Sequence, residues 1–117
     1  MIFQNRVDVT FATPRMQRLF ESEKELRRAH GDRCAKKLMA RLADLRAAST
    51  LEEFRRLPGR CHELDGDRQG QLALELEGGK RLIAAPSGSD VHRADGGLDW
   101  RLVEAVRVIE VVDYHKR

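Results

Sequence analysis

The sequence has few cysteines, few aromatic residues and no long apolar run, and each shortage excludes a class of protein. Two cysteines, Cys34 and Cys61, in 117 residues are too few for the disulfide framework of a small secreted domain, so we expect free thiols. No apolar run approaches the length of a membrane span, and the first residues lack the apolar region and cleavage site of a signal peptide. We therefore expect a cytoplasmic protein with no membrane association.

What is present is typical of one small folded domain. The 117 residues suffice for a single core without disulfides or metal, so we predict one domain over residues 1–117. Charged residues make up 35% of the chain and the net charge is +3. The positive excess lies in residues 1–60, with 14 Lys and Arg against 8 Asp and Glu. A basic surface there could meet phosphates or an acidic partner.

Residues 1–59 predict a strand followed by helices. Val7, Val9 and Phe11 alternate with polar residues, which indicates a strand with one buried face. The pair Thr13-Pro14 is typical of a helix start, and this first helix is expected to continue to Gly31. Apolar residues at helical spacing predict a second helix over residues 33–48, and a capping-box pattern at Thr50 predicts one further helical turn.

From residue 60 the apolar period changes from helical to alternating. Three short strands are expected, over residues 60–65, 71–77 and 80–85, with a two-residue turn at Gly78-Gly79 between the last two. Residues 86–99 are rich in Gly, Ser and Asp and predict an exposed loop. The β-branched run over residues 105–112 predicts a buried strand paired on both sides. The order of elements predicts an α+β sandwich with a mostly antiparallel sheet.

Several side chains could carry chemistry. His62 lies in a strand-like segment on the face of Leu64 and opposite Cys61, and a lone histidine in a strand is more often structural than catalytic. Arg81 lies in an otherwise apolar strand, where a guanidinium can hold a phosphate through two charge-assisted bonds or can simply be a solvated edge residue. Arg68 is a candidate for binding RNA or the ribosome, although it lies in a polar loop, where an arginine without a function is the more common case.

The end of the chain and the second predicted helix add two further candidates. Asp113, Tyr114 and His115 bring three acid or base groups together after the last strand, with no obvious nucleophile beside them. Such a set can activate a nucleophile of the substrate, and RNA has one in its 2′-hydroxyl. Arg33, Lys37 and Arg41 form a basic row that is either a solvated helix face or a contact for RNA or an acidic partner. No second Cys/His pair accompanies Cys61 and His62, so no metal or other cofactor is expected.

Four segments together resemble the HigB-type plasmid-maintenance "killer" toxins of the RelE/ParE superfamily. They are Leu-Pro-Gly-Arg-Cys-His-Glu-Leu over residues 57–64, Gly-Asp-Arg-Gln-Gly over 66–70, Lys-Arg-Leu-Ile over 80–83 and Asp-Tyr-His over 113–115. The resemblance implies a RelE-like α+β fold with an N-terminal strand and two helices packed on the sheet. It implies a cytoplasmic toxin of a type II toxin-antitoxin system, an RNA-binding hydrolase that inhibits translation by cutting mRNA in the ribosomal A site.

The resemblance also implies a site and partners. It assigns catalysis to His62, Arg81, Asp113, Tyr114 and His115, without metal or other cofactor. The implied partners are the 70S ribosome with its mRNA and a helix-turn-helix antitoxin of the HigA type, with the toxin monomeric alone and part of a larger assembly with the antitoxin. Against the family pattern, Asp65, Ala73 and Glu75 stand where lysines are usual, and Leu72 where an aromatic is usual. Lost positive charge predicts weaker phosphate binding and slow or selective cleavage.

Two functions from different classes therefore stay open. One is a ribosome-dependent mRNA interferase. The other is a binding module, either a ParE-like inhibitor of DNA gyrase or a toxin fold that has lost catalysis and serves as an interaction protein. The Asp-Tyr-His end favours the first.

Overall fold

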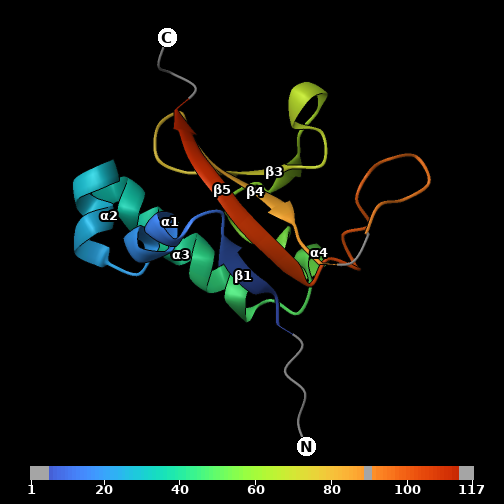
Figure 1. The fold of residues 1–117 in the computed structure, drawn as a ribbon, viewed down its shortest axis with the longest axis horizontal. Helices are drawn as coiled ribbons and strands as arrows, with labels where there is room; N and C mark the ends of the chain where they lie inside the picture. The colour runs from blue at the N-terminus through green and yellow to red at the C-terminus, as the bar shows by residue number, and fades with distance from the viewer. Residues whose placement is uncertain (1–5, 89–90, 114–117) are drawn as a thin grey trace, which may run out of the picture.

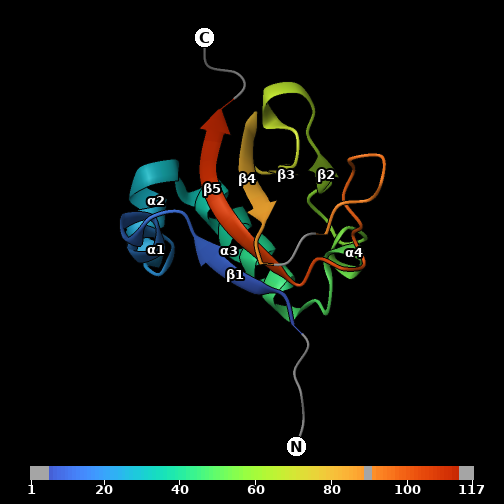
Figure 2. The ribbon, with the colours of Figure 1, turned by 45° about the vertical axis from the view of Figure 1, so that its right-hand side comes forward.

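A computed structural model describes residues 6–88 and 91–113 of the chain. A five-stranded sheet carries helices on one of its faces (Figures 1 and 2). In chain order the elements are β1 (Asp8–Phe11), α1 (Pro14–Phe20), α2 (Glu23–His30), α3 (Asp32–Ala47), α4 (Leu51–Phe54), β2 (His62–Glu63), the 3-10 helix η1 (Gly66–Arg68), β3 (Leu72–Glu75), β4 (Lys80–Pro86) and β5 (Ala105–Asp113). The predicted α+β class is confirmed.

The sheet is mixed but mostly antiparallel, with strand order β1-β5-β4-β3-β2. Strands β2, β3, β4 and β5 pair antiparallel in turn, whereas β1 pairs parallel with β5. The prediction that β5 is paired on both sides holds for Ala105 to Val108, which pair with β1 and β4, whereas residues 110–113 pair with β4 alone among the described residues. The register of the β4-β5 pair shifts between Ile83 and Ala84, so that Ile109 is an extra residue on β5.

The first predicted helix is in fact two helices, which corrects the expectation of one helix up to Gly31. Thr13 caps α1 as predicted, because its hydroxyl accepts a hydrogen bond from the Met16 amide. The chain then breaks at Ser22, whose hydroxyl accepts from the Glu25 amide and starts α2. The pattern Ser-x-x-Glu is itself a capping box, and this local cap outweighs a continuous apolar stripe.

The core lies between α3 and one face of the sheet, which we call the helix face. Leu38, Leu42 and Leu45 of α3 are buried against a layer of strand side chains. Those strand residues are Leu72, Leu74, Leu82, Val106 and Val108, each no more than 2% exposed. The shared orientation of Leu72, Leu74 and Leu76 is therefore confirmed. Because strand side chains alternate, the residues between these project to the opposite face, which we call the outer face.

The loop that follows β4 is less exposed than predicted. Val91 and Leu98 are 7% and 1% exposed, and an isolated bridge joins His92 to Leu98. Trp100 is buried, and its indole N–H donates to a Glu63 carboxylate oxygen at 2.8 Å. The other Glu63 oxygen accepts from the Leu98 amide at 3.0 Å. Glu63 thus fastens this segment to β2, a long-range contact that local composition does not reveal.

Within residues 6–88 and 91–113, no helix combines the length and the apolar character needed to cross a bilayer.

Candidate functional site

The outer face of the sheet brings together two of the predicted site residues. His62 on β2 pairs with Ala73 on β3, and Arg81 on β4 pairs with Glu75 on β3, so these side chains occupy neighbouring rows. They line a hollow of about 400 Å³, which we call the outer cavity. Its lining is completed by Arg60 and Leu64. The sequence-based placement of His62 on the face of Leu64 and away from Cys61 is confirmed, since Cys61 packs against the core.

A left-handed turn before β2 orients His62. Gly59 and Arg60 have φ angles of 116° and 49°, and Arg60 is the only non-glycine residue with positive φ in the described parts of the chain. A side chain at position 59 would be strained at this φ, and its Cβ would lie 2.8 Å from the Arg41 side chain, which would have to shift; both features favour glycine. The Gly59 carbonyl accepts from the Glu75 amide at 2.7 Å, which fixes the turn against β3.

This turn also sets the tautomer of His62. Nδ1 of His62 lies 2.8 Å from the Arg60 carbonyl oxygen. A carbonyl oxygen has no proton to give, so Nδ1 must be the donor. In the neutral ring Nε2 then carries the lone pair, and the described residues offer it no hydrogen bond. His62 is exposed, so Nε2 can accept a proton from a bound molecule.

Two arginines of the outer cavity converge on one carboxylate. Glu75 Oε2 lies 3.0 Å from Arg60 Nε, and Glu75 Oε1 lies 3.7 Å from Arg81 Nη2. The Arg81 guanidinium also donates to the Lys80 carbonyl oxygen at 3.1 Å. A phosphate has the charge and the oxygen geometry to take the place of a carboxylate between two guanidinium groups. The cavity therefore has the donors of an anion site, and Glu75 occupies it.

Arg68 is engaged within the protein. Its guanidinium donates to Gln71 Oε1 at 2.9 Å and to Glu110 Oε2 at 2.8 Å. The second contact joins η1 to β5, two strands beyond β3 in the sheet. This geometry makes Arg68 a link that holds η1 over the outer face. Binding RNA through Arg68 would require these contacts to be exchanged.

The predicted C-terminal set is only partly described. Asp113 pairs with Lys80, and the preceding residue, Val112, pairs with Arg81. Because side chains alternate along β5, Asp113 lies on the face opposite Arg81, and it does not line the outer cavity. Tyr114 and His115 lie outside the described residues. The structure thus unites His62 with Arg81 but does not add Asp113 to them.

The basic row of α3 is largely occupied by internal contacts. Lys37 Nζ lies 3.1 Å from Glu77 Oε2, which joins α3 to the β3-β4 turn. Arg41 Nη1 lies 3.4 Å from Asp44 Oδ2, and its side chain is only 15% exposed. Arg33 is exposed at the start of the helix. Of the three cations in this row, only Arg33 is both exposed and outside an ion pair with a described residue, so it alone is readily available to a phosphate backbone.

Neither cysteine behaves as a reactive thiol. Burial raises the pKa of Cys61 to about 12, although the nearby Arg55 charge favours the thiolate. Burial also raises the pKa of Cys34, against the opposing effect of the Lys80 charge. Both thiols are free and stay protonated at neutral pH. In the described parts of the chain, no group of three or more His, Cys, Asp or Glu is placed to hold a metal ion.

Comparisons with known proteins leave the family open. Scans against family models, curated proteins and solved structures find no match for this chain. The resemblance to HigB-type toxins therefore rests on the four segments quoted above and stays a prediction.

Two residues of the outer cavity, Arg60 and Glu75, are not among the functional candidates that the sequence predicts. Arg60 belongs to the segment over residues 57–64 that resembles the toxin family, and Glu75 stands where the family has a lysine. Strand alternation does indicate Glu75, since it lies two residues from Ala73 and thus on the same face. Its pairing with Arg81 depends on the β3-β4 register, which the Gly78-Gly79 turn sets.

Proposed function

We propose that this protein is a metal-independent endoribonuclease, the toxin of a type II toxin-antitoxin system, and that it cuts translated mRNA in the ribosomal A site. The observation that carries the proposal is the outer cavity, which His62 lines together with Arg60 and Arg81, the two arginines that pair with Glu75. These are the groups that RNA cleavage by an internal nucleophile requires: a proton acceptor beside cations that bind a phosphate.

The proposed reaction uses the 2′-hydroxyl of the substrate. His62 Nε2 takes the 2′-hydroxyl proton while that oxygen attacks the adjacent phosphorus atom. The bond from phosphorus to the 5′ oxygen of the next nucleotide breaks, and a general acid, for which His115 is the sequence-based candidate, gives that oxygen a proton. The products are a 2′,3′-cyclic phosphate and a 5′-hydroxyl. Arg81 and Arg60 stabilise the additional negative charge of the transition state.

The proposal also assigns roles to Asp113, to Arg33 and to a partner protein. Asp113 keeps the orienting role that the sequence suggests, and it lies outside the lining of the outer cavity. Arg33 is the residue of the α3 row best placed to contact ribosomal RNA, since it is exposed. The proposed antitoxin is a small helix-turn-helix protein encoded beside this gene. It co-purifies with the toxin and forms a larger assembly with the otherwise monomeric chain.

One observation favours a second function, that of a non-catalytic interaction module. Glu75 bridges both arginines of the outer cavity and offsets part of their charge. A site closed in this way would bind phosphate weakly, and the fold would then serve only to bind a protein such as an antitoxin or DNA gyrase.

Induced expression followed by primer extension on cellular mRNA distinguishes these functions. The proposal predicts new 5′ ends within translated codons, and their loss in the His62→Gln variant. His92→Gln is the matched control, because His92 is exposed and lies outside the outer cavity. Intact mRNA together with DNA damage would indicate gyrase inhibition. Intact mRNA, normal DNA and normal growth would leave only the interaction module.

A further inference from the structure

Strand β5 has a long stretch without a neighbouring strand on its β1 side. The parallel pairing with β1 covers only Ala105 to Val108, and its last hydrogen bond runs from the Ala12 amide to the Val108 carbonyl. Beyond the bulge at Ile109, residues 110–113 pair with β4 alone among the described parts of the sheet. Figure 2 shows α1 and α2 beside this part of β5, where β1 no longer accompanies it. An edge of this kind offers backbone N–H and C=O groups to another strand.

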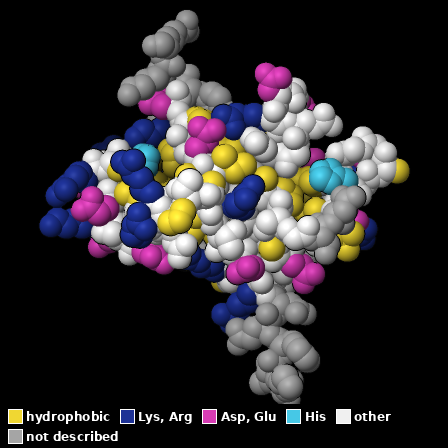
Figure 3. Space-filling view, in the orientation of Figure 1, with side chains coloured by type: hydrophobic (Ala, Val, Ile, Leu, Met, Phe, Trp, Pro, Cys, Tyr) yellow, Lys and Arg dark blue, Asp and Glu magenta, His cyan; other side chains and the backbone are white. Residues whose placement is uncertain are grey.

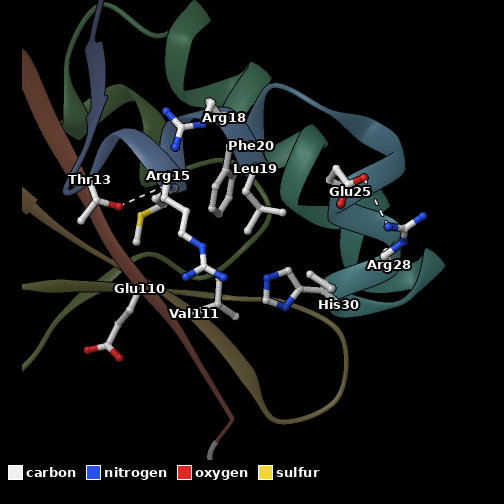
Figure 4. Close-up of a pocket in the computed structure, with 12 residues that line it drawn as sticks. Thr13, Arg15, Arg18, Leu19, Phe20, Glu25, Arg28, His30, Glu110 and Val111 are labelled. Carbon is white, nitrogen blue, oxygen red and sulfur yellow. Dashed lines mark hydrogen bonds and ion pairs between the residues drawn. The ribbon is translucent and has the colours of Figure 1, made fainter.

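A hollow of about 650 Å³ separates this edge from the α1-α2 pair. We call it the edge groove. Its floor is apolar, formed by Met16, Leu19 and Phe20 of α1 and Val111 of β5. Figure 4 shows Leu19 and Phe20 projecting into this space. Helix α1 has no fully buried residue, so the apolar stripe that its sequence predicts remains half-covered.

The rim of the edge groove is positively charged. Arg15 and Arg18 line it, and neither guanidinium group has an ion pair or hydrogen bond to another described residue. The acidic residues of the lining are already engaged: Glu25 pairs with Arg28 at 3.7 Å, and Glu110 pairs with Arg68 at 2.8 Å. Glu110 also points away from the groove in Figure 4. Lys and Arg side chains gather over the α1-α2 side of the molecule in Figure 3. A bound group would therefore meet two cations without partners.

We propose that the edge groove binds an extended, acidic segment of a partner protein, which adds to the sheet as a strand beside residues 110–113 of β5. The edge supplies backbone hydrogen bonds, and alternate side chains of the segment enter the apolar floor. Carboxylates at the intervening positions meet Arg15 and Arg18. An extended segment fits better than the alternative occupants. A bound helix uses its own backbone groups internally and a small apolar acid has none, so either would leave the N–H and C=O groups of the β5 edge without partners.

This surface is separate from the outer cavity, since no residue lines both. The inference holds whether or not the protein cleaves RNA.

The experiment selects peptides from two displayed libraries against the full-length protein. One library places Val, Ile or Leu at every second position, and the other places them at helical spacing. In both, the remaining positions are drawn from Glu, Gln and Lys. The proposal predicts enrichment from the alternating library, with Glu at the variable positions. Enrichment of helical, Lys-rich or Gln-rich peptides would overturn it. So would enrichment no greater than on the control protein Met16→Asp, whose substitution places a charge in the apolar floor of the edge groove.

Variants of both molecules then test the mode of binding. Arg15→Glu and Arg18→Glu each weaken the selected peptide at least about tenfold, whereas Lys36→Glu, an exposed helical cation outside the groove, leaves its affinity unchanged. Circular dichroism confirms that each variant is folded, and the arginines are exposed enough for substitution to spare the core. Two further peptides carry N-methyl groups on every second amide, one on the odd and one on the even positions. In an added strand only one of these sets donates hydrogen bonds to β5, so one methylated peptide should lose binding and the other should keep it. Equal binding by both methylated peptides would show that no strand is added, and equal loss with Lys36→Glu would show unspecific charge attraction.

Discussion

Replacing Glu75 by glutamine should strengthen the binding of RNA phosphate to the outer cavity. The Glu75 carboxylate lies 3.0 Å from Arg60 Nε and 3.7 Å from Arg81 Nη2. A phosphate that binds both guanidinium groups must displace this carboxylate or remain close to it. Glutamine keeps the size of the side chain and removes its charge.

The size of the effect follows from Coulomb's law. A carboxylate about 5 Å from a phosphate costs roughly 1 to 3 kcal/mol for effective dielectric constants between about 80 and about 20. The Arg60 side chain is 85% exposed, so the effect should fall in the lower part of that range. A gain of about 1 to 2 kcal/mol in the free energy of phosphate binding corresponds to roughly fivefold to thirtyfold tighter binding. The lost ion pairs should cost the fold no more than about 1 kcal/mol each.

The assay compares Glu75→Gln with the parent in two measurements. One is the anisotropy of a labelled oligoribonucleotide whose 2′-hydroxyls are methylated, so that it cannot be cut. The other is the rate of mRNA cleavage on programmed ribosomes at limiting toxin. Glu77→Gln is the matched control, because it removes the same charge from an ion pair with Lys37, on α3. Unchanged binding in Glu75→Gln would refute the phosphate site, and tighter binding with slower cleavage would make Glu75 a participant in the reaction.

Three further predictions concern stability and the chain end. Glu63→Ala leaves the indole N–H of the buried Trp100 without its acceptor, so urea unfolding should show a loss of roughly 1 to 3 kcal/mol, whereas Glu104→Ala, on an exposed residue, should show almost none. Burial, and next the Lys80 charge, lower the pKa of His30; the unfolded chain then binds the extra proton, so stability should be full above about pH 6.5 and fall as pH drops through that value toward the folded pKa. A His30→Gln variant with the same slope in that range would contradict this assignment. Finally, His115→Gln should slow cleavage at least about tenfold without weakening antitoxin binding, because glutamine cannot exchange a proton near neutral pH; cleavage at the parental rate would show that the leaving oxygen takes its proton from another group, such as one of the ribosome.

The sequence by itself determined the class of the fold and most element positions. Alternation placed β1, β3, β4 and β5 within about two residues of their observed bounds, and the caps at Thr13 and Thr50 start helices as predicted. These features are local, because capping and strand alternation involve residues only a few positions apart. At Ser22 two local signals compete, because a capping box lies within an apolar stripe, and the cap starts a new helix.

The candidate site was predictable in part. Alternation placed His62 on the face of Leu64, and the family resemblance selected His62 and Arg81, which the sheet does bring together. No local pattern predicts the contact of Glu75 with both Arg60 and Arg81. It depends on the register of two strand pairs and on the left-handed turn at Gly59 and Arg60, where the φ of 116° at position 59 favours glycine.

Only the tertiary structure decided which charged residues are available to a partner. The sequence predicts three available cations in the α3 row, yet Lys37 and Arg41 are paired with acidic residues. Arg68 likewise donates to Glu110, 42 positions away in the chain. Conversely, Arg15 and Arg18 had no distinguishing pattern, and the fold leaves them beside an uncovered strand edge. Pairing and exposure depend on long-range contacts between side chains, whereas periodicity reports only the local face on which a residue lies.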